Sequence, residues 1–326
     1  MRIPLGCRGV IVAAGVILSL GLVSVSIAAG PTYNLKKLKG SITADGSSTV
    51  GPYTTRAAEL FRRAGATGVK VTVGISGTGG GFQRFCKGET DLSDASRPMR
   101  VSEAQSCKTN NIGSWRAFTV ANDALTVVVN QQNTWAQCLS VAELKKIWEP
   151  GSKVNNWKDV RSSFPDVPIK LFGPGTDSGT FEYFTEAING RARASRTDYQ
   201  ASEDDNVLVQ GVSGERGGLG YFGYSYYTQH RNSLNAVQVR NPKTDSCVAP
   251  GVATVHNNSY KPLSRPLFVY AKGSSFKRQE VQAFLDFIFD KEVKIANQAR
   301  FVSLTKQQLK KARANFILAV KSAKKL

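Results

Sequence analysis

The sequence predicts an α/β fold, because short apolar runs alternate with amphipathic segments along the chain after Pro31. Strands that alternate with helices predict mainly parallel connections between strands. No internal repeat or long low-complexity linker interrupts the pattern, and 326 residues are enough for two packed domains. The predicted strands cover residues 41–44, 69–75, 125–129, 169–172 and 267–270.

Helices are predicted by apolar residues that recur at spacings of three and four, and by capping signals. Capping boxes begin two helices, one at Ser102 with Gln105 and one at Ser140 with Glu143. The second of these helices stops at Pro150-Gly151. The apolar faces predict further helices over 53–64, 82–86, 181–188 and 281–288.

The first residues have the pattern of a secretory signal peptide. Arg2 and Arg8 form a basic start, an apolar run follows over 10–27, and Ser26-Ile-Ala-Ala29 supplies small residues for cleavage. An uncleaved membrane anchor is the alternative, since the run is almost long enough to span a bilayer. Its glycines and serines favour cleavage, so we expect residues 1–29 to be removed and the chain to be exported to the periplasm or cell surface.

Four cysteines remain after the signal peptide, and an even count in an exported chain predicts disulfides. Four cysteines allow three pairings. Cys86–Cys107 is the more local choice and leaves Cys138–Cys247. A zinc site is not expected, because no Cys-x-x-Cys pair exists and neither histidine lies near a cysteine at ligand spacing.

The chain is strongly basic, with a formal net charge of +19. Nucleic acid is the partner that such a charge first suggests, but export and the even spread of lysines and arginines argue against it. The charge is concentrated only in the tail 306–325, where Leu309, Ala312, Phe316 and Val320 predict a terminal amphipathic helix with a solvated basic face. A positive field still helps to collect small anions.

Three loops rich in glycine and hydroxyl side chains each precede a predicted helix. They are Asp45-Gly-Ser-Ser-Thr49, Ser76-Gly-Thr-Gly-Gly-Gly81 and Gly173-Pro-Gly-Thr-Asp-Ser-Gly-Thr180. A helix start offers unpaired N–H groups and the positive end of the helix dipole, which bind phosphate-like anions. One such loop alone is more often a helix cap, but three together predict one tetrahedral oxyanion held from several sides.

Two other motifs are rejected. Gly218-Leu-Gly-Tyr-Phe-Gly223 has the spacing of a dinucleotide fingerprint, but it follows a glycine-rich turn instead of a strand. Ser48 and Ser178 are candidate nucleophiles, but a serine nucleophile needs a positioned base, and neither histidine lies in a partner motif. A binding protein is therefore favoured over an enzyme.

Arg97 is the candidate cation of the oxyanion site. It stands in Thr90-Asp-Leu-Ser-Asp-Ala-Ser-Arg-Pro98, at the end of a strand of small residues. A guanidinium can pair with two phosphate oxygens in one plane. The alternative is a surface salt bridge to Asp91 or Asp94.

Taken in order, these motifs resemble the substrate-binding proteins of high-affinity phosphate ABC importers, the Pst system. The resemblance covers essentially all of the mature chain. It also includes Glu203-Asp-Asp-Asn-Val207 and Tyr260-Lys-Pro-Leu-Ser-Arg-Pro-Leu-Phe268. It implies an extracytoplasmic protein, expected as a monomer without a cofactor, that captures inorganic phosphate and delivers it to membrane permease subunits.

The resemblance also implies a two-lobed, type II periplasmic-binding-protein-like fold with the ligand in the cleft between the lobes. Lobe I would comprise residues 30–121 and 262–326, and lobe II residues 122–261. Asp177 would support the last anion loop. The implied phosphate ligands are Ser47, Ser48, Thr49, Gly77, Thr78, Ser96, Arg97, Ser178, Gly179 and Thr180.

One departure from the family pattern concerns selectivity. The best-known members carry an aspartate where Arg97 stands, and an arginine near Gly173-Pro-Gly175. That aspartate accepts a proton from phosphate, so Asp177, Asp204 or Asp205 is expected to replace it. A binding protein for sulfate or another tetrahedral oxyanion is one alternative function, and a secreted phosphatase or phosphoesterase is the other.

Overall fold

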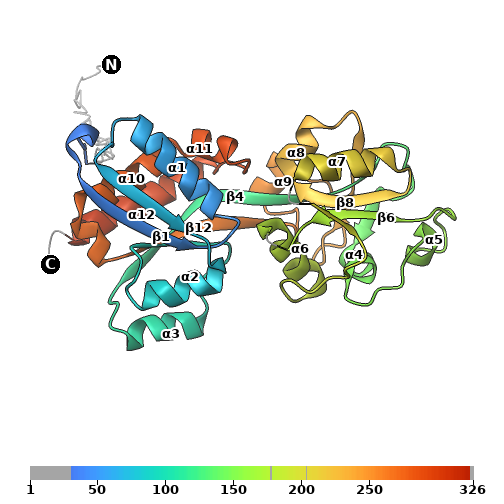
Figure 1. The fold of residues 1–326 in the computed structure, drawn as a ribbon, viewed down its shortest axis with the longest axis horizontal. Coiled ribbons are helices and arrows are strands. Elements are labelled where there is room, and N and C mark those ends of the chain that lie inside the picture. Colours follow the sequence, from blue (N-terminus) through green and yellow to red (C-terminus); the bar gives the residue numbers. More distant parts are fainter. Residues whose placement is uncertain (1–30, 177, 203, 324–326) are drawn as a thin grey trace, which may run out of the picture. The chain divides into compact units, whose positions relative to one another are not determined.

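The computed structural model describes residues 31–176, 178–202 and 204–323, so the predicted signal peptide lies outside the described residues. Two groups of elements, which we call the first and second lobe, are bridged by β4 (Trp115–Asn130) and β12 (Ser264–Lys272). These two strands pair antiparallel over nearly the full length of β12 and run together between the groups (Figure 1).

The first lobe is built from the chain before β4 and after β12. Its elements are η1 (Leu35–Lys37), β1 (Gly40–Gly46), α1 (Gly51–Arg63), β2 (Val69–Gly74), α2 (Gly77–Cys86), β3 (Leu92–Ala95), α3 (Val101–Thr109), η2 (Ser274–Lys277), α10 (Gln279–Asp290), α11 (Glu292–Gln298) and α12 (Lys306–Ala323).

The second lobe is built from the chain between the two bridging strands. Its elements are β5 (Cys138–Ser140), α4 (Val141–Trp148), α5 (Trp157–Val160), β6 (Lys170–Pro174), α6 (Gly179–Asn189), β7 (Gln200–Ser202), α7 (Asp205–Gly214), β8 (Gly218–Gly223), α8 (Tyr224–Gln229), β9 (Leu234–Ala236), β10 (Gln238–Arg240), β11 (Cys247–Val248) and α9 (Val252–His256).

In the described residues, one sheet of nine strands runs through both lobes in the order β2-β1-β3-β12-β4-β8-β6-β7, with β9 also paired to β4. Its two ends are parallel, since β1 pairs with β2 and β3, and β6 pairs with β7 and β8. Its middle is antiparallel, from β3 through β12 and β4 to β8. The prediction of mainly parallel connections is therefore correct at the ends and wrong in the middle, where the bridging strands run in opposite directions.

The predicted strands and helices coincide with elements of the structure, apart from one helix start. The capping box of α4 is confirmed, because Glu143 N donates to Ser140 Oγ at 3.1 Å and Ser140 N donates to Glu143 Oε2 at 2.8 Å. The box at Ser102 is wrong, because α3 already begins at Val101. There Glu103 accepts from Arg100 N at 2.7 Å and fixes the first turn two residues earlier.

The Gly-x-Gly-x-x-Gly segment forms strand β8 itself and pairs with β4 from Leu125 opposite Gly223 to Val129 opposite Leu219. A dinucleotide fingerprint needs a loop between a strand and a helix. Because the glycines lie within the strand, the rejection of a dinucleotide site is confirmed.

Each lobe has its own apolar core. In the first lobe, Phe61 packs edge-on against Phe284 with ring centroids 5.4 Å apart, and α12 adds its buried Phe316. In the second lobe, the rings of Phe184 and Tyr221 stack at 3.8 Å. The predicted terminal helix is thus confirmed as a core element.

Both predicted disulfides are confirmed. Cys86–Cys107 joins α2 to α3 in the first lobe, and Cys138–Cys247 joins β5 to β11 in the second. Within the part of the chain that the structure describes, no helix combines the length and apolar character needed to cross a membrane.

Candidate oxyanion-binding site

The candidate site begins where two neighbouring parallel strands end. β1 and β3 are in register with Gly46 opposite Asp94, so the loops that follow them leave the sheet side by side. Ser47 N donates to the carbonyl of Asp94 at 2.9 Å, which ties the first anion loop to β3. The carboxyl ends of parallel strands are where α/β proteins bind ligands, so this sheet edge is a candidate ligand-binding edge.

The first anion loop, Ser47 to Thr49, is organised by its own serine. Ser47 is buried, and its Oγ accepts from the N–H groups of Thr49 at 3.2 Å and Val50 at 3.3 Å. Ser48 and Thr49 are directed outward to other elements. Ser48 Oγ donates to Glu182 Oε2 of α6 at 3.4 Å, and Thr49 Oγ1 accepts from Arg265 Nη2 at 3.1 Å. The loop therefore contacts both the second lobe and a bridging strand.

The second anion loop begins α2 and is held by the buried carboxylate of Asp45. One Asp45 oxygen accepts from Ser76 N at 3.1 Å, and the other accepts from Ser76 Oγ at 3.0 Å. Gly77 has φ +77°, which a residue with a side chain rarely adopts. Thr78 Oγ1 then lies 3.0 Å from Ser96 Oγ and accepts from Ser96 N at 3.2 Å, so the loops after β2 and β3 meet at these hydroxyls.

The third anion loop begins α6, and its predicted residue Asp177 lies outside the described residues. Ser178 Oγ caps the helix by accepting from Thr180 N at 3.1 Å and from Phe181 N at 3.5 Å. A Cβ atom added to Gly179 would lie 2.5 Å from Thr49 Oγ1 and 2.7 Å from Thr49 N. Only a glycine allows so close an approach, and through it the structure brings the first and third loops together.

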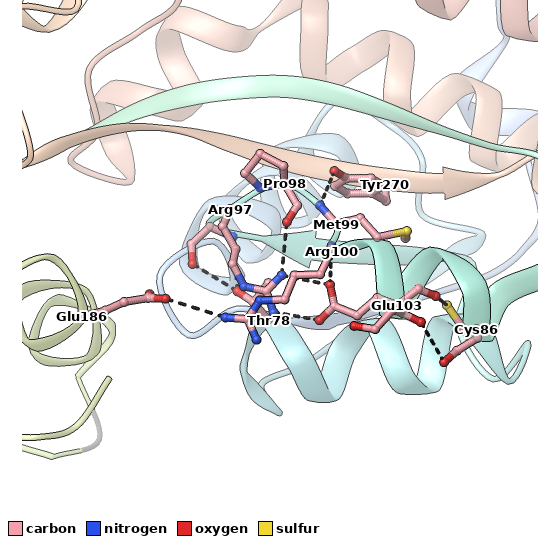
Figure 2. A network of polar contacts seen from close by, with 12 residues as sticks. Thr78, Cys86, Arg97, Pro98, Met99, Arg100, Glu103, Glu186 and Tyr270 are labelled. Carbon is pink, nitrogen blue, oxygen red and sulfur yellow. Dashed lines mark hydrogen bonds and ion pairs between the residues drawn. The ribbon is translucent and has the colours of Figure 1, made fainter. Parts of the chain in front are cut away.

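Arg97 extends from the end of β3, and its guanidinium is held by Glu103 (Figure 2). Nη1 donates to Glu103 Oε2 at 2.9 Å and Nη2 donates to Glu103 Oε1 at 2.7 Å. Neither aspartate considered from the sequence is the partner, since Asp91 pairs with Arg278 and Asp94 accepts from a threonine. The salt-bridge alternative named the wrong acid, because the turn into α3 brings Glu103 back over Arg97.

Arg265 is a site residue that the sequence reasoning did not single out. It lies on β12, where Nη2 donates to Thr49 Oγ1 and Nε donates to Asp123 Oδ2 at 3.4 Å. Its guanidinium lies 3.5 Å above the ring centroid of Tyr183, a residue of α6. It stands within the segment Tyr260 to Phe268 that carries the family resemblance, but nothing in the sequence indicates that this strand passes the first anion loop.

The acids around the site differ in environment. Asp94 is fully buried, accepts from Thr54 Oγ1 at 2.9 Å, and burial raises its pKa to about 7. Burial likewise raises the pKa of Asp123 despite its arginine neighbour. Asp204 is exposed, and its Oδ1 caps α7 by accepting from Asn206 N at 2.9 Å. Asp205 is the first residue of the same helix.

An ion pair also connects the lobes beside the three loops. Arg100 Nη2 lies 3.9 Å from Glu186 Oε1 of α6 (Figure 2). Glu182 and Glu186 stand one turn apart, so one face of α6 contacts the first lobe at Ser48 and again at Arg100.

Known proteins resemble this chain in sequence and in fold. Residues 32–292 match the PBP superfamily domain. The chain is 43% identical to protein SphX of Synechococcus elongatus, over 89% of this chain and 85% of that protein. It is 36% identical to the phosphate-binding protein PstS of Staphylococcus epidermidis, over 84% of this chain and 82% of that one.

Solved structures show the same fold. A possible phosphate-binding protein from Planctomyces limnophilus superposes with a TM-score of 0.82 at 45% identity, over 87% of this chain and 99% of that one. A putative phosphate ABC transporter substrate-binding protein with bound phosphate, from Clostridium perfringens, has a TM-score of 0.58 at 24% identity and supports the fold alone. The chain therefore belongs to the PBP superfamily, and within it to the family of phosphate-binding proteins of ABC phosphate importers.

Proposed function

We propose that this protein binds inorganic phosphate between its two lobes and delivers it to an ABC permease in the membrane. One observation carries the proposal. Gly179, at the start of α6, lies against Thr49, and Arg265 donates to the same threonine. Two helix N-termini and one guanidinium thus converge, which is the donor set that a tetrahedral oxyanion needs.

The proposed ligand shell combines the three anion loops with both arginines. The hydrogen bond between Thr78 and Ser96 supports a common site for the second loop and the end of β3. The names of the Staphylococcus and Planctomyces relatives support phosphate as the oxyanion. The proposed ligands are Ser47, Ser48, Thr49, Gly77, Thr78, Ser96, Arg97, Asp177, Ser178, Gly179, Thr180 and Arg265.

Closure of the lobes is the proposed functional motion. We place the lobe boundaries at residues 30–121 with 262–326, and at 122–261, so that β4 and β12 form the hinge. Hinge closure around the ligand is a mechanism known for periplasmic binding proteins. The Ser48–Glu182 and Arg100–Glu186 contacts would stabilise the closed form.

We also propose that the protein is exported through its signal peptide and acts as a monomer. Two disulfides support an oxidising compartment. The family is a class of transport proteins and not of enzymes, and neither Ser48 nor Ser178 has a histidine partner among its described contacts.

Titration calorimetry of the mature protein tests this proposal. Phosphate should bind with about micromolar affinity or better, which corresponds to about −8 kcal/mol. Sulfate should bind well over tenfold more weakly, because a carboxylate that faces the ligand penalises the anion that has no proton to donate. Equal binding of both anions would favour a general oxyanion protein, and hydrolysis of a chromogenic phosphate ester would favour the phosphatase alternative.

The proton acceptor is proposed among Asp177, Asp204 and Asp205. Each aspartate is changed to Asn in turn. The variant at the position that faces the ligand should have a smaller preference for phosphate over sulfate, since an amide can turn its NH₂ toward an unprotonated oxygen. Asp204 already caps α7, and because Asn caps a helix about as well as Asp, its variant should leave that helix start intact. An unchanged ratio in all three variants would contradict this assignment.

A further inference from the structure

A cavity of about 710 Å³ adjoins the oxyanion site. It shares Ser96, Arg97 and Arg265 with that site, while much of its remaining wall comes from the second lobe. Pockets of about 300 to 1,000 Å³ hold ligands far larger than one tetrahedral anion. The cavity therefore has room for more than the phosphate that the loops are proposed to hold.

Two lysines make the second-lobe wall of this cavity cationic. Lys261 Nζ donates to the carbonyl of Ser264 at 2.6 Å, and Lys243 stands in the same wall. Burial lowers the pKa of Lys261, and repulsion by the positive charge of Lys243 lowers it further. In contrast to Arg97 and Arg265, neither lysine forms an ion pair with a described residue.

The remaining polar groups of the wall do not cancel this charge. Glu186 is the one acid among the described lining residues, and it faces Arg100 of α3. Thr244, Asn257 and Asn258 add hydroxyl and amide groups that can donate to an anion or to a sugar. A neutral organic group would leave the repulsion between the lysines in place, whereas a second anion would relieve it.

We propose that this cavity is a second anion subsite, and that the protein accepts condensed phosphates such as pyrophosphate. One phosphoryl group occupies the three anion loops, and the other lies between Lys243 and Lys261. Arg265 borders both spaces and can donate to either group. The inference rests on the proposed phosphate function and widens its ligand class.

Calorimetry on the mature protein tests the subsite, with phosphate and pyrophosphate titrated separately and in competition, without divalent cations. Pyrophosphate should compete with phosphate in the wild-type protein. Lys243→Gln and Lys261→Gln should each weaken pyrophosphate about tenfold, the loss expected for one charge-assisted hydrogen bond. The affinity for phosphate should change less than about twofold in both variants, since neither lysine contacts a described residue of an anion loop.

Lys145→Gln is the matched control. Lys145 is an exposed residue of α4, so its substitution removes the same charge from the second lobe but away from the cavity. Its pyrophosphate affinity should equal that of the wild type. Phosphate binding without competition by pyrophosphate would overturn the subsite alone, as would equal losses in the control and the cavity variants. A phosphomonoester that competes better than pyrophosphate would overturn the preference for a second anion. Absence of phosphate binding would overturn the proposed function and the subsite together.

Discussion

The regions around Arg97 and Arg265 each place a guanidinium beside the oxyanion loops. The carboxylates that hold these two arginines differ, because their pKa values are shifted in opposite directions. Burial raises the pKa of Glu103, but hydrogen bonds from Arg97 and from Arg100 N outweigh it and leave the pKa lowered. Burial also raises the pKa of Asp123, and there the single 3.4 Å contact with Arg265 does not outweigh it. The bidentate pair of Arg97 and Glu103 therefore interacts more strongly than the pair of Arg265 and Asp123.

This difference indicates which arginine is available to a ligand. Both terminal nitrogens of Arg97 already donate to Glu103, so a phosphate would compete with a carboxylate for them. Among the described residues, Arg265 has one long contact to an acid, and it directs Nη2 to a hydroxyl of the first anion loop. We therefore expect Arg265 to supply more of the binding free energy than Arg97, although the sequence points to Arg97.

The largest effect is expected for Arg265→Ala, which should weaken phosphate binding about a hundredfold or more, as for the loss of one partner in a buried charged pair. Arg265→Lys should also lose most of the affinity, because an ammonium lacks the planar fork. Calorimetry measures both variants, with exposed Arg191→Ala as the control. The double variant Arg265→Ala with Asp123→Asn tests whether an unpaired Asp123 is responsible, and wild-type affinity in Arg265→Ala would reverse the comparison.

The second effect concerns the contact that brings Arg265 and the third loop to Thr49. Gly179→Ala should weaken phosphate binding by about tenfold or more, because the new Cβ would lie 2.5 Å from Thr49 Oγ1 and force the loops apart. Gly214→Ala is the control, since a Cβ there meets nothing within 4 Å. If both alanine variants bind phosphate equally well, the two loops do not need to approach each other.

A smaller effect is expected for Arg97→Ala, which should weaken phosphate binding by about tenfold or less, because Glu103 neutralises part of the charge that is removed. Glu103→Gln frees the guanidinium of Arg97, so the affinity of this variant for phosphate should equal or exceed that of the wild type. Calorimetry of the two variants in parallel gives the sign of each change. Complete loss of binding in Arg97→Ala, with Arg265→Ala unaffected, would assign the main role to Arg97 after all.

The smallest effect concerns the pH dependence of stability. The pKa of Glu103 is below its ordinary value of 4.5, so it contributes stability above that pH, which is lost as the pH falls through the lowered pKa. The pKa of Asp123 is above its ordinary value of 3.8, so its contribution is present below that pH and is lost as the pH rises through the raised pKa.

Urea unfolding at a series of pH values distinguishes the two carboxylates. Relative to wild type, Glu103→Gln should lose stability mainly at neutral pH, by less than about 1 kcal/mol because the ion pair is partly screened by solvent. Asp123→Asn should remove the decline in stability between acid and neutral pH that Asp123 causes. Parallel pH profiles for both variants would show that the two pairs are equivalent.

Local sequence was a reliable guide wherever a local force decides the structure. The hydroxyl of Ser178 caps α6 and that of Ser140 caps α4, because each cap depends on residues two or three positions away. The predicted helix start at Ser102 was wrong, because Glu103 accepts hydrogen bonds from Arg97 and from the N–H of Arg100 and so begins the helix earlier. A competing contact within seven residues was enough to move the boundary.

The sequence by itself determined the alternation of strands and helices, the three anion loops and the family, because these depend on residue type, spacing and order. Only the tertiary structure decided that Glu103 holds Arg97, that Gly179 meets Thr49, and that Arg265 reaches the first loop across 216 positions of sequence. The physical reason is that β4 and β12 pair antiparallel through the middle of the sheet. Their register places Arg265 opposite Asp123 and close to the loop that precedes α1. No local pattern in the sequence predicts that proximity.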